Sequence, residues 1–445
     1  MIIYIFITQM MLLIISYSIN KKNIFKWILL FNVWWLLLLL FNIIVPYGGY
    51  KSSVIGETFV WIFLIFTTVG YTFPRTNLKK RYKNFSLSKD KKNLEKNFKK
   101  LITKSIRIKI LMFLLDLILI IYAIRYSNYI QSTSVLNSRI ARFYVGGVFH
   151  STIELLFFNY VIATSRFFAI FIIVYGVIYK EFKNILFLLS IINVFLYSFI
   201  GGSRFPIVML GVETIILFLY QKQFIIKKIS IFRINLKKIK EKIIFLTCIF
   251  VIMFIMMYFT AYRLGMIKFS FELLIKAYEA LYKQCIGYNI GPIAALDKLL
   301  NDGTIKNNFY FGKAVLLNGI DEVIYNIFSI IKLPYHSARY TLGTISNESI
   351  ILGNNSFNAL YTCIFWFYSD MGMIGVIFYS LLFGFFVGHI VREFDYKATL
   401  WKLMLFLHIL YFFIMSNINW EINTVDSLVY ILFILLYFRK KERRI

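Results

Sequence analysis

Long apolar segments separated by basic ones dominate the chain. The first three apolar segments are Ile2 to Ile19, Trp27 to Val45 and Val54 to Phe73. Each fits the length of about 17–25 residues that a helix needs to cross the hydrocarbon core of a bilayer. The segment that follows, 75–109, holds 14 basic and 2 acidic residues. Because short cytoplasmic loops collect Lys and Arg, this segment is predicted to lie in the cytoplasm.

The same alternation continues to the end of the chain. Further spans are predicted at Ile110 to Tyr126, a segment ending near Tyr179, Asn184 to Ile200, Pro206 to Tyr220, Ile243 to Tyr262, Gly372 to Val391, Thr399 to Ile418 and Leu428 to Phe438. Segment 222–242 carries 8 basic residues and 1 acid, and the tail from Arg439 to Arg444 is a third basic cluster. Four spans separate each cluster from the next. All three clusters can therefore be cytoplasmic if the N-terminus is outside.

The predicted fold class is an all-α polytopic integral membrane protein with about 11 transmembrane helices. Regions 143–179 and 357–391 are long enough for an extra hairpin or re-entrant helix, and one span in each keeps the basic clusters on one side. The predicted parts are residues 1–262 with spans one to eight and cytoplasmic loops 75–109 and 222–242, a large extracytoplasmic loop 263–356, and residues 357–445 with the last spans and the basic tail.

The large loop has 9 basic and 7 acidic residues, so it is nearly balanced in charge. Helix signals are present within it. Ser270 would cap a helix that runs to about Lys283, and Pro292 would begin a second helix that stops at Asn301-Asp302-Gly303. A third helix is predicted from Gly312 to Ile331.

Composition supports a membrane protein. The chain is 60% apolar and 16% charged, whereas globular domains average about 45–50% apolar and about 25% charged residues. Disorder is excluded because it requires low hydrophobicity. The net charge of +29 lies mostly in the predicted loops, so no nucleic-acid partner is expected. Cys248, Cys285 and Cys363 show neither a disulfide framework nor a metal-ligand spacing. Met1 to Ile19 begins without a basic n-region, so no cleavable signal peptide is expected.

Arginine is enriched on the predicted outer side. Of the 50 basic residues, 35 fall in cytoplasmic segments, and only 8 of those are Arg. The other 15 include seven arginines, which are Arg125, Arg139, Arg142, Arg166, Arg204, Arg263 and Arg339. A guanidinium grips phosphate oxygens bidentately and stays charged when partly desolvated. A pyrophosphate-bearing lipid in the outer leaflet is a ligand that would need several of them.

Each arginine also has a purely structural interpretation. Arg125 is expected to be a membrane-interface anchor. Arg139 and Arg142 are three residues apart and would share a helix face, as a phosphate-binding pair or as an ordinary surface pair. Arg166 lies within an apolar run, where a charge is costly and usually functional or paired. Arg204 follows Gly201-Gly202-Ser203, so a tight turn is expected to present its guanidinium at the outer membrane surface, or to place it as an interface residue. Pro206, just after Arg204, would start a helix whose N-terminus favours an anion.

A catalytic base is expected in the large loop. His336 lies three residues before Arg339, where a neutral imidazole could take a proton from a sugar hydroxyl, although single loop histidines are usually only solvated. Glu348, Glu322, Asp321 and Glu272 are the alternative bases. No metal-site spacing and no glycine-rich nucleotide motif is present, so no metal and no cofactor is predicted.

Several of these features resemble a known family, the bacterial O-antigen polymerases of the Wzy type. The similar features are the turn at Gly201 and Gly202 before Arg204, the large loop after it, and the stretches Asn354-Asn355-Ser356-Phe357-Asn358, Tyr368-Ser369-Asp370-Met371-Gly372-Met373-Ile374-Gly375 and Gly384. In this resemblance Gly201, Gly202, Asp370, Gly372 and Gly375 are motif residues.

The resemblance implies a GT-C-like membrane glycosyltransferase at the outer face of the bacterial cytoplasmic membrane. Such an enzyme transfers the growing glycan from undecaprenyl diphosphate to the next undecaprenyl-diphosphate-linked unit, in O-antigen or capsular polysaccharide synthesis, and a chain-length regulator is an implied partner. Arg204, Arg339, Arg263, Arg142, Arg139 and Arg166 would bind the diphosphate, and His336 or Glu348 would be the base. An O-antigen ligase and a lipid-linked oligosaccharide flippase remain alternatives; a flippase predicts matching internal repeats.

Overall fold

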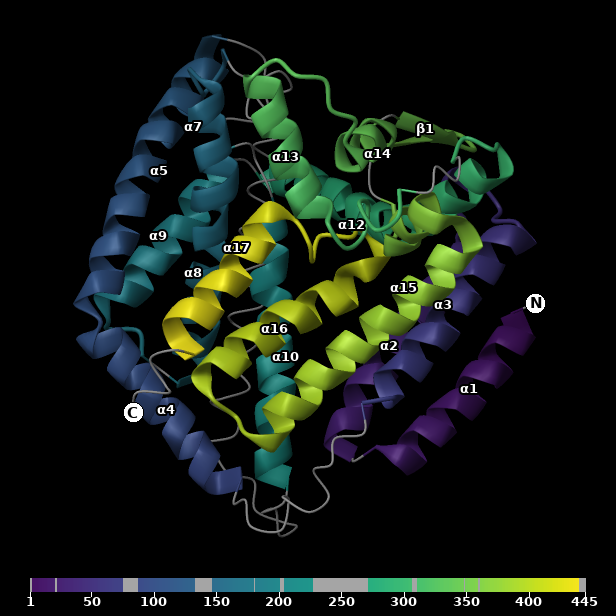
Figure 1. Ribbon diagram of the computed structural model, residues 1–445, viewed down its shortest axis with the longest axis horizontal. Coiled ribbons are helices and arrows are strands. Elements are labelled where there is room, and N and C mark those ends of the chain that lie inside the picture. Colours follow the sequence, from purple (N-terminus) through teal and green to yellow (C-terminus); the bar gives the residue numbers. More distant parts are fainter. Residues whose placement is uncertain are drawn as a thin grey trace. The chain divides into compact units, whose positions relative to one another are not determined.

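The computed structural model is helical through most of the residues that it describes (Figure 1). These residues are 2–20, 22–74, 87–132, 146–179, 181–200, 204–226, 271–305, 310–347, 349–358 and 361–439. They form two compact units, and each is described by itself. Unit 1 comprises Met1–Phe85, Gln284–Ala398 and Ile409–Leu428, and unit 2 comprises Ser86–Lys283, Thr399–His408 and Val429–Ile445.

Most helices follow the apolar segments of the sequence, and others lie in the basic segment 75–109 and in the large loop 263–356. Their bounds are α1 Ile2–Ile19, α2 Lys22–Ile44, α3 Val54–Thr72, α4 Leu87–Lys104, α5 Ile106–Ser132, α7 Thr152–Phe157, α8 Ala163–Tyr179, α9 Ile185–Phe199, α10 Phe205–Ile226, α12 Phe271–Asn301, α13 Asn318–Ile330, α14 Ala338–Asn347, α15 Cys363–Tyr396, α16 Leu400–Ile414 and α17 Val425–Phe433. A π-helix, Phe158–Ile162, joins α7 to α8, and a second, Ile434–Arg439, follows α17.

Five helical segments are long and apolar enough to cross a membrane. They are Ile24–Ile44, Val54–Thr72, Thr152–Tyr179, Cys363–Tyr396 and Leu400–Asn417. Shorter apolar helices cover Tyr4–Ile19, Ile185–Phe199 and Phe205–Tyr220. The prediction of a helical, multi-pass membrane protein is thereby confirmed. The predicted span Ile243 to Tyr262 lies outside the described residues.

Within unit 1, α3 and α15 pack closely because glycines face the neighbouring backbone. A Cβ added to Gly70 would lie 2.1 Å from the carbonyl oxygen of Leu381, and one added to Gly384 would lie 2.1 Å from that of Thr67. Membrane helices lack a hydrophobic driving force between them, so small residues that allow such close approach favour their association. The same positions tolerate no larger side chain without separation of the two helices.

Helix α15 begins before the predicted span Gly372 to Val391 and is interrupted where that span was predicted to start. Helical structure already starts at Cys363, and the backbone leaves the helical region at Met371 and at Gly372, where φ is 62°. A positive φ is readily adopted by glycine, which has no Cβ. The residues after the break, up to Tyr396, are long enough to cross a bilayer by themselves.

The prediction that a second helix begins at Pro292 in the large loop was wrong. Pro292 does not begin a helix, because α12 runs through it from Phe271 to Asn301. The turn after Pro292 is fully buried from Ile293 to Leu296, and this packing outweighs the hydrogen bond that the proline removes. Gly291 contributes to the packing, since a Cβ there would lie 2.4 Å from the ring of Phe357. Ser270, the predicted cap, lies outside the described residues.

The large loop also contains a β-hairpin that the all-α prediction missed. Strands β1 (Ser349–Leu352) and β2 (Asn355–Asn358) pair antiparallel, with Leu352 opposite Asn355. Gly353 in the connecting turn has a φ of 57°. The backbone N–H of Asn354 donates to the carbonyl oxygen of Gly48 at 2.8 Å, so the turn is fastened to the 46–50 segment before α3. The motif Asn354-Asn355-Ser356-Phe357-Asn358 is thus part of this hairpin.

Helix α13 begins at Asn318, six residues after the predicted start, and the cause is a buried carboxylate. Asp370 is fully buried and accepts hydrogen bonds from the backbone N–H groups of Gly312 at 2.7 Å and Ala314 at 3.2 Å. The hydroxyl of Tyr379 also donates to it. Gly312 has a φ of 93°, so the chain forms turns there. The Asp370 carboxylate holds those turns in place of a first helical turn.

Candidate functional site

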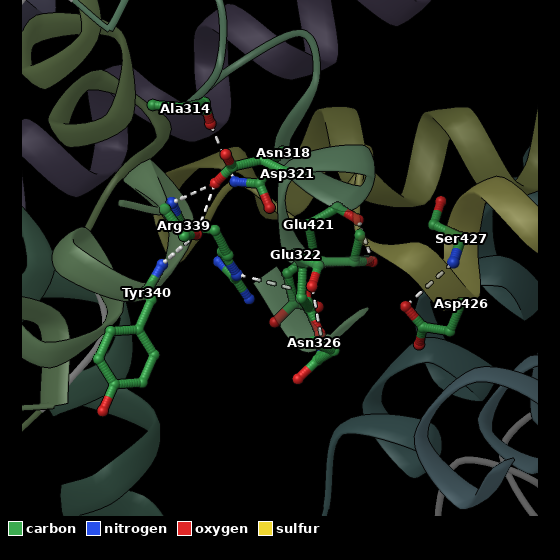
Figure 2. Close-up of polar contacts among 12 residues, drawn as sticks. Ala314, Asn318, Asp321, Glu322, Asn326, Arg339, Tyr340, Glu421, Asp426 and Ser427 are labelled. Atoms are coloured by element: carbon green, nitrogen blue, oxygen red, sulfur yellow. Dashed lines mark hydrogen bonds and ion pairs between the residues drawn. The ribbon is translucent and has the colours of Figure 1, made fainter. Parts of the chain in front are cut away.

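The candidate site is centred on Arg339 in unit 1, at the start of α14. The side chain of Asp321, from the first turn of α13, accepts hydrogen bonds from the Ser337 hydroxyl at 2.6 Å and from the backbone N–H of Arg339 at 3.0 Å. Ser337 also accepts from the backbone N–H of Tyr340 at 3.0 Å. The first N–H groups of a helix have no partner within it, so these two acceptors fix the start of α14. Figure 2 shows the bond from the backbone N–H of Arg339 to Asp321.

The side chain of Arg339 lies between a carboxylate and an aromatic ring. Its Nε is 3.7 Å from Oε2 of Glu322, and its guanidinium carbon is 5.0 Å from the centroid of the Trp366 ring. Figure 2 shows the guanidinium directed toward Glu322. The Arg339 side chain remains 26% exposed. We call Arg339, Glu322 and Trp366 the Arg339 cluster.

Trp366 is held in place by the segment between α16 and α17. Its indole N–H donates to Oδ1 of Asn419 at 3.0 Å. The ring belongs to the part of α15 before the break and is buried. A fixed indole face opposite a guanidinium gives a cation–π contact, which stabilises the arginine side chain in one orientation. The same segment carries Glu421, and Asp426 lies in the first turn of α17; both are drawn with Arg339 and Glu322 in Figure 2.

Three tyrosines lie close in sequence to the Arg339 cluster, on α13, on α14 and in the segment that joins them. The rings of Tyr325 and Tyr340 are stacked with centroids 4.7 Å apart, and Tyr340 is exposed. Tyr335 donates its hydroxyl to Oδ1 of Asp321 at 2.7 Å. Burial, together with the hydrogen bond to this carboxylate, raises the pKa of Tyr335 to about 12. Tyr335 is therefore a protonated hydrogen-bond donor at neutral pH.

His336 is exposed, and hydrogen bonds from its two neighbours in sequence to Asp321 fix the position of its backbone. It lies between Tyr335 and Ser337, and both neighbours donate to Asp321. The predicted base and Arg339 are thus on one short segment of unit 1. Among the alternative bases, Asp321 already accepts three hydrogen bonds and serves as a cap, so the structure favours Glu322 over it. Glu348 and the side chain of Glu272 lie outside the described part of the chain.

Two of the predicted phosphate-binding arginines are described in unit 2. Arg204 is 7% exposed, so its guanidinium is not at the surface as predicted. Its carbonyl accepts from the backbone N–H groups of Ile207 and Val208, both at 3.0 Å, at the start of α10. Pro206 lies in the first turn of α10, as its fixed φ predicts. The side chain is therefore directed inward from a helix start.

Arg166 is a buried-helix arginine with an aromatic partner. Its Nη1 donates to the hydroxyl of Tyr197 at 2.8 Å, and its guanidinium lies over the rings of Phe167 and Tyr197. The Tyr197 hydroxyl and the faces of these aromatic rings therefore help the apolar run to accommodate the charge. Arg125 is ion-paired with Glu154, at 3.2 Å from each carboxylate oxygen.

Several predicted site residues lie outside the described residues. They are Gly201, Gly202, Arg139, Arg142 and Arg263. The remaining motif residues have structural roles in unit 1. Asp370 holds the turns at 312–314, and Gly372 lies at the break in α15. A Cβ added to Gly375 would lie 2.3 Å from the carbonyl oxygen of Phe367.

Sequence reasoning missed Trp366 and the role of Asp297. Trp366 lies in an apolar segment, where only its position four residues before Asp370 distinguishes it. Asp297 is fully buried and caps α3, since it accepts from the backbone N–H groups of Ser53 at 2.8 Å and Gly56 at 2.9 Å. Comparisons of this chain with family models, curated proteins and solved structures give no match.

Proposed function

We propose that this protein is a membrane glycosyltransferase that polymerises lipid-linked oligosaccharide repeat units. It would transfer the glycan chain from undecaprenyl diphosphate to the next undecaprenyl-diphosphate-linked unit at the outer face of the bacterial cytoplasmic membrane. The observation that carries the proposal is the Arg339 cluster, in which an arginine lies against Trp366 beside Glu322. The finer topology, eleven spans in a GT-C-like arrangement, belongs to the same proposal.

The cluster combines the groups that this chemistry needs. The acceptor hydroxyl oxygen attacks the anomeric carbon of the donor sugar, and the bond from that carbon to the diphosphate oxygen breaks with its electron pair. Arg339 would stabilise the charge that develops on the diphosphate. The hydroxyl proton passes to a base, for which His336, exposed, and Glu322, half-buried, are the described candidates.

The aromatic residues favour a saccharide substrate. Sugar rings present apolar C–H faces and polar hydroxyl edges, and amphipathic aromatic side chains match both. Tyr340 is 56% exposed and stacks on Tyr325, so its outer face is available for such a contact. Carboxylates at the same place, such as Glu322, accept hydrogen bonds from sugar hydroxyls.

Glycan chain length tests the proposal. Deletion of the gene should leave surface glycan one repeat unit long, and purified protein in lipid nanodiscs should lengthen a lipid-linked repeat unit. Complete loss of surface glycan on deletion would instead support the ligase or the flippase. A nanodisc preparation that binds the lipid-linked unit without forming longer products would contradict polymerase activity.

The proposed topology has its own test. Cysteines placed at two exposed positions, Asn354→Cys and Lys96→Cys, should react with an impermeant maleimide from outside the cell and from the cytoplasm, respectively. Asn354 lies in the hairpin turn, and Lys96 lies on the basic helix α4. The reverse pattern of labelling would overturn the orientation.

A further inference from the structure

Helix α13 has two different faces. One face carries Asp321, Glu322 and Tyr325, which contact α14 and the residues before it. The opposite face carries Ile320, Val323, Ile324 and Ile327, at the spacing i, i+3, i+4 and i+7. Ile320 and Ile327 are 50% and 51% exposed. The helix therefore presents its polar face to the protein and its apolar face outward.

The exposed apolar surface extends past both ends of α13. The large aliphatic side chains in it that are at least 46% exposed are Leu316, Leu317, Ile320, Ile327, Ile330, Ile331 and Leu333. A contiguous apolar surface in water costs on the order of 25 cal/mol per Å², and such patches mark sites of contact with a protein or a membrane. We call these seven residues the α13 apolar surface.

The start of α13 is fastened to residues that follow a membrane span. The carbonyl oxygen of Val315 accepts from the indole N–H of Trp420 at 3.1 Å and from the amide of Asn423 at 2.7 Å. Both donors come shortly after the apolar span Leu400–Asn417 ends. Gly319 packs on the same segment, since a Cβ there would lie 2.6 Å from the carbonyl oxygen of Asn423.

A second connection leads to the beginning of another span. Asp370 precedes the break in α15, and the bilayer-length part of that helix follows the break. Its carboxylate holds the backbone of Gly312 and Ala314. The chain just before α13 is thus bound to the break in α15 and to the residues that follow the span Leu400–Asn417. This places the start of α13 at the level of the membrane boundary.

Length and charge identify the bilayer as the partner. A helix of 13 residues is too short to span a membrane, which takes about 20 residues. Exposed lysines, Lys313 and Lys332, flank the apolar surface at its two ends, where they complement the phosphates of lipid headgroups. Amphipathic helices with this pattern lie in the plane of the interface.

We propose that α13 lies in the membrane interface, with the α13 apolar surface buried among phospholipid acyl chains. Glu322, on the opposite face, then lies on the aqueous side, and its ion pair holds Arg339 there. The inference concerns the membrane contact alone and does not depend on the proposed glycosyltransferase activity.

Spin-label accessibility tests this contact. The full chain, with Cys248, Cys285 and Cys363 replaced by alanine, is reconstituted in nanodiscs of phosphatidylethanolamine and phosphatidylglycerol, and labels are attached at Ile320→Cys and Ile327→Cys. A label at Ser329→Cys is the matched control, because Ser329 is exposed on the polar side of the same helix. Collisions with oxygen should exceed collisions with a water-soluble nickel complex at 320 and 327, and the ratio should invert at 329.

The other occupants of the surface give different results. Dominant collisions with the nickel complex at 327 would show that the surface faces water and would overturn the proposal. Low collision rates with both reagents at 320 and 327 would show that a protein segment or a second copy of the chain covers it, and would overturn it equally. If the alanine background does not fold, the labels are attached with Cys363 retained, since that thiol is fully buried.

Discussion

The Asp370 carboxylate accepts a 2.7 Å hydrogen bond from the backbone N–H of Gly312, a residue 58 positions earlier in the chain. This contact ties the turns before α13 to the break in α15. Because α13 carries Glu322 and the following segment carries Arg339, the geometry of the Arg339 cluster depends on a carboxylate that is itself outside the cluster.

Substitution of Asp370 should therefore destabilise unit 1. In Asp370→Asn, the amide replaces one acceptor oxygen with a donor, so one of the two backbone N–H groups loses its partner. We expect a loss of about 2–4 kcal/mol, because the bonds are buried and one partner is charged. The measurement is thermal unfolding of the purified protein in detergent.

Asp302→Asn is the matched control. Asp302 forms an exposed ion pair with Lys298 at 3.1 Å, and such pairs contribute about 0–1 kcal/mol. Equal unfolding temperatures for the Asp370 and Asp302 variants would contradict the structural role of Asp370.

Arg204→Lys should lower transferase activity at least tenfold while the protein still inserts into the membrane. The Arg204 side chain is 7% exposed, and a lysine point charge cannot reproduce the planar fork of a guanidinium. Activity is followed by glycan chain length in cells. Arg125→Lys should leave it near the native level, since Arg125 is ion-paired with Glu154. Native chain lengths in Arg204→Lys would remove Arg204 from diphosphate binding.

His336→Ala and Glu322→Gln distinguish the two described candidates for the base. General base catalysis contributes about 10²–10⁴ in rate, so loss of the true base should lower turnover by that factor and leave binding of the lipid-linked substrate intact. The ion pair with Glu322 holds Arg339, the proposed diphosphate ligand, in place. Glu322→Gln should therefore also weaken substrate binding. Single-turnover rates and substrate affinity are both measured. Unchanged turnover in His336→Ala would exclude His336 as the base.

Tyr335 should make stability depend on alkaline pH. Burial and the hydrogen bond to Asp321 raise its pKa from near 10 to about 12. A group whose pKa is raised by folding contributes stability that is complete below its unfolded pKa, here near pH 10, and that is lost as pH rises toward about 12. Tyr335→Phe should cost about 1.5–3 kcal/mol at neutral pH, the value of a hydrogen bond to a charged group. The difference from the native protein should shrink between pH 10 and 12.

Tyr4→Phe controls for the tyrosine substitution, because Tyr4 is 73% exposed. Unfolding temperatures of both variants are compared with the native protein across this pH range. A Tyr335→Phe variant as stable as the native protein at neutral pH would show that the bond to Asp321 contributes nothing.

The sequence by itself determined the helical membrane class and most helix bounds in the described residues. Spans such as Val54 to Phe73 were predicted closely because a bilayer admits only long apolar helices, and length and hydrophobicity are local properties. The sequence also predicted that His336 and Arg339 lie on one short segment of the large loop, three residues apart. The function of these residues stays a prediction.

Only the tertiary structure decided the features for which contacts with residues far away in the sequence override the local sequence pattern. Pro292 stays inside α12 because the turn after it is buried, and α13 starts late because Asp370 binds the backbone of Gly312. The pairing of Arg339 with Glu322 and Trp366, like the buried position of Arg204, likewise could not be derived from spacing. The physical reason is that a buried carboxylate or guanidinium is satisfied by whichever groups the fold brings near it, and these are far away in the chain.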